Sequence, residues 1–206
     1  MTSGTERAPA IDATTADTLI RRGLRLEYAT LGWNVVGSVV VITAAIAAGS
    51  VALAGFGLDS LIEIFASVVV VWQLKGVNKT REHRALRLIG IAFFALAAYI
   101  TGQIMYTLLR AEHPATSTSG MIWLAATFIA MILLAYGKRR TGRQLGNPVL
   151  STEAHVTVID AVLAGAVLVG LVLNAALGWW WADPLAGLVI VYYGFKEGWG
   201  IWHGEG

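Results

Sequence analysis

Residues 51–74 read VALAGFGLDSLIEIFASVVVVWQL, an apolar run whose only charged side chains are Asp59 and Glu63. About 20 mainly apolar residues are enough for a helix to span the hydrocarbon core of a bilayer. The run therefore predicts a membrane helix that carries two carboxylates inside the hydrocarbon layer.

Five further apolar runs flank this one along the chain. With it they predict six transmembrane helices, at about residues 26–47, 51–74, 86–109, 121–136, 150–177 and 179–202. Hydrophobic residues make up 56% of the 206 residues and charged residues only 14%, against about 25% charged residues in soluble domains. We therefore expect an all-α, polytopic membrane protein, with the bilayer lipid as one of its partners.

The same composition limits the domain organisation and excludes several classes of function. We expect a cytoplasmic, disordered N-terminal tail over residues 1–23, a six-helix transmembrane domain over 24–202 and a short tail over 203–206. No segment remains to bury a second, water-soluble core, so nucleic-acid binding by a separate module is excluded. Cysteine is absent, which rules out disulfides and thiolate ligands. Because no cofactor fingerprint, serine-nucleophile motif or histidine-rich centre is present, we expect neither an enzyme nor a prosthetic group.

The basic residues predict which side of the membrane the termini face. Fourteen of the 15 Lys and Arg residues precede the first predicted helix, lie between the second and third or the fourth and fifth, or come near the end of the last. Arg110 alone falls on the other side. Because cytoplasmic loops are enriched in Lys and Arg, both termini should be cytoplasmic. We expect a multi-pass protein of the plasma membrane.

Carboxylates inside the predicted helices are the strongest functional signal, because each one is costly in hydrocarbon. Asp59 and Glu63 are one turn apart on one helix face, and Asp160 lies in the fifth predicted helix. At 1.5 Å per residue they lie about 12, 18 and 15 Å from the starts of their helices, near the middle of a core about 30 Å thick. Three carboxylates at one level cannot all stay ionised without a cation between them. The pattern predicts a site that holds either a divalent cation or protons, and so exchanges one for the other.

Three further residues carry weaker signals. Glu153 shares the helix face of Asp160 but lies lower, at the predicted cytoplasmic mouth of the site. Asn34, in the first predicted helix, offers either a carbonyl oxygen to an ion or a hydrogen bond to a neighbouring helix. His155 either binds metal at the entrance with Glu153 or has no ligand role, because its side chain is about 140° from that of Asp160 around the helix.

Residues near the predicted helix ends are expected to have interfacial or structural roles. Glu27 lies near the start of the first predicted helix, and Asp183 with Pro184 opens the last one as an N-terminal turn. Lys138 begins the basic run between the fourth and fifth predicted helices, which we expect to be a cytoplasmic loop.

Together these features resemble the transmembrane domain of the cation diffusion facilitator family over about residues 24–202. The resemblance is carried by Asn34, Gly49-Ser50-Val51-Ala52-Leu53, the pair Asp59 and Glu63, Asp160, and Asp183-Pro184. Members export divalent cations, often zinc, in exchange for protons, through an Asp-x-x-x-Asp pair on helix 2 and a His-x-x-x-Asp pair on helix 5. The resemblance implies proton-coupled antiport that exports metal from the cytoplasm, and a homodimer formed through transmembrane helices.

The chain also departs from the family pattern. Asp59 and Glu63 fall on the helix 2 pair and Asp160 on the helix 5 aspartate, while Val156 stands where the family has histidine. A site of three carboxylates is harder than the family's usual one, which brings manganese and iron(II) into consideration beside zinc. The family's C-terminal cytoplasmic domain has no counterpart in residues 203–206, so the resemblance is to a short branch with a lone membrane domain.

Two other functions remain open beside metal transport. A structural or accessory membrane protein would use the carboxylates only to specify helix packing. A carrier for a small organic cation would use them as counter-ions in a roomy, aromatic site. The sequence around Asp59, which is rich in Leu, Ile, Ser and Gly, suits a small ion better.

Overall fold

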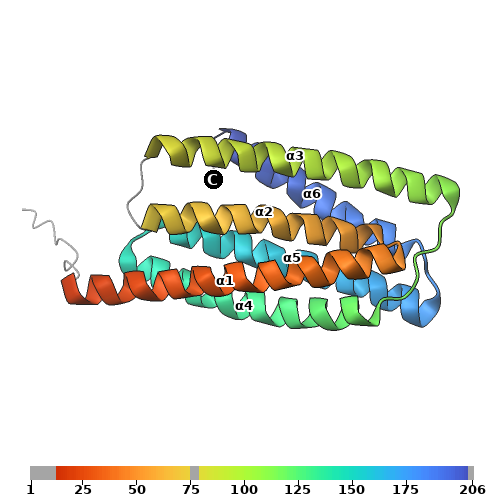
Figure 1. The fold of residues 1–206 in the computed structure, drawn as a ribbon, viewed down its shortest axis with the longest axis horizontal. Coiled ribbons are helices and arrows are strands. Elements are labelled where there is room, and N and C mark those ends of the chain that lie inside the picture. The colour runs from red at the N-terminus through yellow and green to blue at the C-terminus, as the bar shows by residue number, and fades with distance from the viewer. Residues whose placement is uncertain (1–12, 75–78, 204–206) are drawn as a thin grey trace, which may run out of the picture.

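The computed structural model describes residues 13–74 and 79–203, and this part of the chain is all helical, without strands (Figure 1). Its helices are α1 (Ala13–Ala48), α2 (Val51–Leu74), α3 (Lys79–Arg110), α4 (Thr118–Leu145), α5 (Pro148–Leu177) and α6 (Ala182–His203). The all-α prediction is confirmed.

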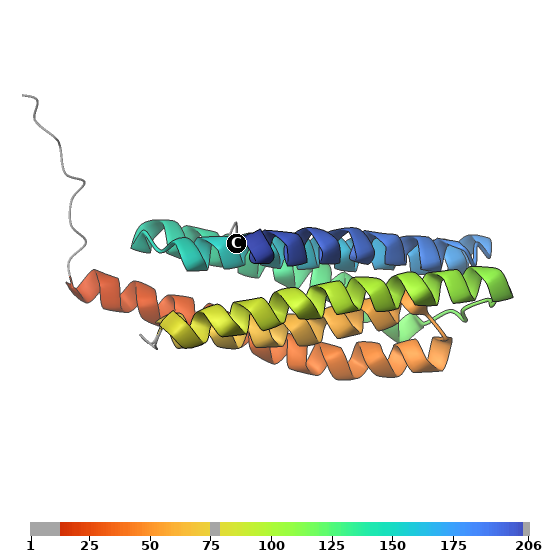
Figure 2. The ribbon, with the colours of Figure 1, turned by 90° about the horizontal axis from the view of Figure 1, so that it is seen from above.

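The helices alternate in direction along one common axis and form a long bundle (Figure 1). Seen from above, α1, α2 and α3 form one layer, and α4, α5 and α6 form the other (Figure 2). α1 begins and α6 ends at the same end of the bundle. Within it, α2 packs against α1, α3, α5 and α6, which makes α2 the junction between the two layers.

Five of the helices, α1 to α5, are long and apolar enough to cross a membrane. α6 has 22 residues, but Asp183, Lys196 and Glu197 lower its mean hydropathy. It still packs along α3 and α5 as a full member of the bundle. The chain is therefore built as a multi-pass membrane protein, as the apolar runs predict.

The first helix begins earlier than the sequence predicts. We expected a disordered tail up to residue 23, but α1 begins at Ala13. Arg21 pairs with Asp17 one turn earlier at 2.6 Å, an i, i+4 ion pair that supports the first turns of the helix. Extending an existing helix is also easier than starting one. The tail prediction is wrong for residues 13–23 and for His203, which ends α6; residues 1–12 and 204–206 lie outside the described residues.

The fourth helix is longer than its apolar core. Hydropathy predicts residues 121–136, but α4 begins after Ser117, whose hydroxyl accepts a hydrogen bond from the Gly120 N–H, and ends before Gly146 in the left-handed conformation. Hydropathy marks where apolar residues stop, whereas caps decide where backbone hydrogen bonding stops. The basic run that begins at Lys138 is therefore part of a helix and not of a loop.

Asp183, at the start of α6, holds the start of α2. Its carboxylate accepts hydrogen bonds from the Ser50 hydroxyl at 2.5 Å and from the backbone N–H groups of Val51 at 3.0 Å and Ala52 at 3.4 Å. Unpaired N–H groups at a helix N-terminus favour an anion. Asp183 is thus a buried cap that one helix supplies to another.

Replacing Asp183 by Ala should destabilise the bundle, because three buried donors lose their acceptor. We expect a loss of about 1–3 kcal/mol in the free energy of unfolding, measured by denaturant unfolding of the purified protein in detergent. Glu112→Ala, at an exposed position between α3 and α4, is the control. An Asp183→Ala protein that unfolds at the wild-type midpoint would contradict the capping role.

Candidate functional site

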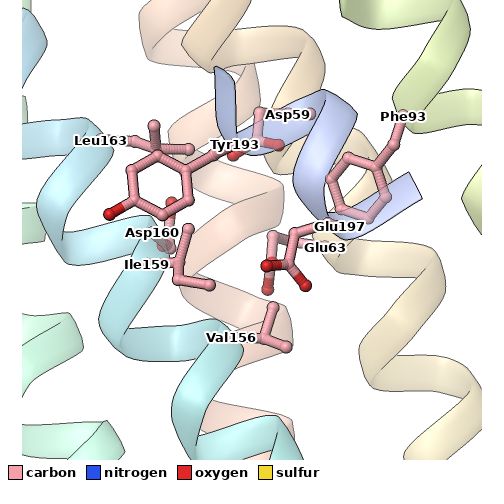
Figure 3. Close-up of a pocket in the computed structure, with 10 residues that line it drawn as sticks. Asp59, Glu63, Phe93, Val156, Ile159, Asp160, Leu163, Tyr193 and Glu197 are labelled. Carbon is pink, nitrogen blue, oxygen red and sulfur yellow. The ribbon is translucent and has the colours of Figure 1, made fainter. Parts of the chain in front are cut away.

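A small pocket lies inside the bundle between α2, α3, α5 and α6, with a cavity volume of about 10 Å³. A cavity of this size holds about one water-sized sphere. Four carboxylates line it: Asp59, Glu63, Asp160 and Glu197 (Figure 3). The other lining residues are apolar, aromatic or glycine, namely Phe93, Val156, Ile159, Leu163, Tyr193 and Gly194.

The structure brings together the three carboxylates that the sequence predicts at one level of the membrane. α2 supplies Asp59 and Glu63 one turn apart, and α5 supplies Asp160 from another side of the pocket (Figure 3). Their exposed fractions are 3%, 3% and 1%. Three acidic side chains from two helices are thus shielded from solvent around one small space.

Two of these buried carboxylates have oxygens without hydrogen-bond partners. Within the described part of the chain, neither carboxylate oxygen of Asp160 has a partner, nor does Oε2 of Glu63. Such groups are costly unless a proton or a cation neutralises them. No three Asp, Glu or His side chains in residues 13–74 and 79–203 lie close enough together to hold a metal ion as they stand. Ligation of one ion in this pocket therefore requires side chains to turn towards each other.

Glu197 is the pocket carboxylate that the sequence reasoning missed. It follows Lys196 directly, close to the end of the last apolar run, where charges are common. The available signal is spacing, because Glu197 comes four residues after Tyr193 and the two therefore share a face of α6. Which helix that face meets depends on the packing of the bundle and cannot be read from one helix.

A second cluster of buried charges joins α1, α4 and α5. The Nζ atom of Lys138 lies 3.1 Å from Oε2 of Glu27 and 3.2 Å from Oε1 of Glu153. It also donates a hydrogen bond to the Thr157 hydroxyl at 3.1 Å. The side chains of Lys138 and Glu27 are fully buried. Because Glu153 precedes Asp160 by seven residues, Glu153 lies about 10 Å along α5 from Asp160.

This cluster corrects one sequence expectation, decides between two alternatives for a second residue and separates a third from the pocket. Lys138 is not a loop charge, because it lies on the buried face of α4 with Met131, Ala135 and Gly142, at helical spacing. Of the interfacial and structural roles expected for Glu27, the structure favours the structural one, because Glu27 is enclosed as a partner of Lys138. Glu153, the candidate entrance ligand, pairs with Lys138 and is not one of the residues that line the pocket.

The two remaining candidate ligands also stand apart from the pocket lining. Asn34 is buried in α1, and its side-chain Nδ2 has no hydrogen-bond partner among the described residues. His155 is exposed on α5, and it interacts electrostatically with Glu197. The structure therefore groups Asp59, Glu63 and Asp160, and it separates them from Glu153, Asn34 and His155.

Comparison with known proteins identifies the family. Residues 28–202 match the family model of the Cation efflux transmembrane domain. The chain belongs to this family. It is also similar to Transmembrane protein 163 of Xenopus laevis, with 20% identity over 189 residues, which cover 85% of this chain and 66% of that protein. The chain thus spans just under two thirds of the length of this relative.

Membership in the Cation efflux family confirms the resemblance drawn from the residues. The family is one of transporters and not of enzymes. All four pocket carboxylates fall inside the matched range. The pocket is therefore part of the cation efflux domain itself.

Replacing Lys138 by Met should destabilise this cation efflux domain strongly. The change keeps most of the side-chain volume but leaves Glu27 and Glu153 buried without a counter-charge. Removing one partner from a buried ion pair costs about 3–5 kcal/mol, and denaturant unfolding in detergent measures the loss.

A matched triple variant separates charge from packing. Glu27→Gln, Lys138→Met and Glu153→Gln together remove all three charges, and this variant should regain much of the stability that Lys138→Met alone loses. A Lys138→Met protein as stable as the wild type would show that the ion cluster does not hold the three helices together.

Proposed function

We propose that this protein is a metal cation transporter, and that it works as a proton-coupled antiporter that exports a divalent metal from the cytoplasm, with Asp59, Glu63 and Asp160 as the metal ligands. Zinc, manganese and iron(II) are the candidate cargoes. The observation that carries the proposal is the set of buried carboxylate oxygens of Asp160 and Glu63 that have no partner among the described residues. They belong to a pocket inside an apolar bundle, where a neutralising charge is needed most.

Exchange follows from the chemistry of such a site. A carboxylate must be deprotonated to bind metal, so metal binding releases protons. When the metal leaves, protons have to return, because the buried carboxylates are costly as unpaired charges. The same oxygens thus hold the two species in turn, which is the physical basis for coupling an outward flux of metal to an inward flux of protons.

The surrounding residues take secondary roles in this proposal. Glu153 lies about 10 Å along α5 from Asp160, towards the end of the bundle where α1 begins and α6 ends. In this proposal that end is cytoplasmic, and Glu153 lies on the path of the ion from the cytoplasm to the pocket. Asn34 and His155 have no direct contact with the ion. The proposal includes a homodimer formed by helix faces in the plasma membrane, with both termini cytoplasmic.

The pocket argues against the two rival functions to different degrees. A cavity of about 10 Å³ is too small for an organic cation. A purely structural role for the carboxylates predicts that they bond to one another or to neighbouring helices, yet both oxygens of Asp160 lack partners in the described chain. A functional test on Asp160 therefore separates transport from packing.

Asp160→Asn keeps the shape of the side chain and removes its charge. If Asp160 is a ligand, metal affinity and flux should fall by at least about tenfold while the protein stays folded. Flux in proteoliposomes, with an imposed pH gradient and a panel of Zn²⁺, Mn²⁺ and Fe²⁺, measures this. Glu112→Gln, the same chemical change at an exposed position, is the control. Wild-type affinity and flux in Asp160→Asn would favour the packing role.

The topology can be tested by single cysteines, because the natural chain has none. Thr116 and Gln144 are both exposed and lie at opposite ends of α4, Thr116 two residues before the helix and Gln144 in its last turn. In intact cells a membrane-impermeant thiol reagent should label Thr116→Cys, and it should label Gln144→Cys only after permeabilisation. The reverse pattern would invert the direction of transport in this proposal.

A further inference from the structure

We propose that Glu197 of α6 is a fourth ligand of the transported cation, and that it completes an all-oxygen site for hard divalent cations such as Mn²⁺. The inference rests on the proposed function, because it concerns the same pocket. It adds a ligand from a third helix to the carboxylates of α2 and α5. Glu197 is half-buried and lines the pocket together with Asp59, Glu63 and Asp160 (Figure 3).

The packing of α6 brings this carboxylate to the pocket. α6 contacts α2, α3 and α5. Gly194, one residue after Tyr193, also lines the pocket, and a Cβ there would lie 3.3 Å from the backbone oxygen of Phe93. The absence of a side chain at Gly194 therefore permits α6 to approach α3 closely. Glu197 follows Gly194 by three residues, about one helical turn, and therefore also reaches the pocket, beside the other carboxylates.

Glu197 makes no salt bridge in residues 13–74 and 79–203, whose ion pairs lie elsewhere, although the charges of His155 and Lys196 act on it. Its neighbour Lys196 instead lies over the ring of Tyr193, at 5.6 Å from the centroid. Glu197 and Asp59 are close enough for their charges to interact. Like charges that face one pocket repel each other unless a cation lies between them.

The donor set defines the class of cation. The ten described lining residues offer carboxylate oxygens and one phenol oxygen, but no imidazole nitrogen and no sulfur. Carboxylate and other oxygen ligands suit hard cations such as Mn²⁺ and Mg²⁺, whereas imidazole and thiolate favour softer ions such as Zn²⁺. Val156 contributes only hydrocarbon to the lining, so this position is where a nitrogen donor can be introduced as a probe.

The first experiment measures Mn²⁺ binding to the full chain in lipid nanodiscs, through the loss of the free Mn²⁺ signal in electron paramagnetic resonance. Glu197→Gln should weaken Mn²⁺ binding by about tenfold or more, as expected for removal of a charged ligand. Glu112→Gln, the same change at an exposed position, should bind Mn²⁺ like the wild type. Asp160→Asn reports on the proposed function separately.

The second experiment tests the donor atoms directly. Pulsed electron paramagnetic resonance of bound Mn²⁺ should show no coupling to ligand nitrogen in the wild type. Val156→His should introduce such a coupling and should raise the affinity for Zn²⁺ relative to Mn²⁺. A change in the ligand spectrum is a readout that a merely structural role for these residues would not produce.

The outcomes distinguish this inference from the function on which it rests. Wild-type Mn²⁺ affinity in Glu197→Gln, together with loss of binding in Asp160→Asn, overturns the role of Glu197 alone. A wild-type chain that binds none of Mn²⁺, Zn²⁺ and Fe²⁺ overturns the proposed function. Nitrogen coupling in the wild-type spectrum overturns the all-oxygen site. Should Glu197→Gln fail to fold, Glu197→Asp must weaken binding by shortening the ligand, and unchanged affinity in that variant overturns the proposal equally.

Discussion

Every carboxylate enclosed in this bundle must be neutralised, because an unpaired charge in an apolar interior is costly. The chain itself neutralises some of them. Asp183 receives the donors at the start of α2, and Lys138 serves both Glu27 and Glu153. Asp160 accepts no hydrogen bond and forms no salt bridge among the described residues. The structural acids thus have a partner built into the chain, whereas Asp160 depends on a proton or an ion from outside it.

The enclosed position of α2 explains why the pocket forms where it does. Asp183 fixes the start of this helix, and a Cβ at Gly57 would lie 2.7 Å from Ile42 of α1, so α1 and α2 are in close contact two residues before Asp59. α2 therefore has little freedom to shift its acidic face. Its carboxylates are presented to α5 and α6 from a backbone that is held both at its end and along its length.

The sequence predicts well the features that depend on the geometry of a single helix. It predicts poorly the features that depend on how two helices pack against each other. The spacing of Asp59 and Glu63, and the depth of Asp160, follow from the rise of a helix and from the length of the apolar runs. The burial of Lys138 does not, because it begins a run of basic residues and only the helical face that it shares with apolar neighbours marks it as enclosed. The sequence does not mark Glu197 for the same reason, because its position at the pocket depends on how α6 packs against α2 and α5.

The buried lysine also bears on the pocket through its charge. Lys138 acts electrostatically on Glu63 and on Asp160, beyond the residues that it contacts. Glu153 acts on the same two carboxylates with the opposite sign. The ammonium of Lys138 therefore favours negative charge on Glu63 and Asp160, whereas Glu153 opposes it. Because Lys138 and Glu153 are themselves paired, the ion cluster and the pocket form one connected electrostatic unit.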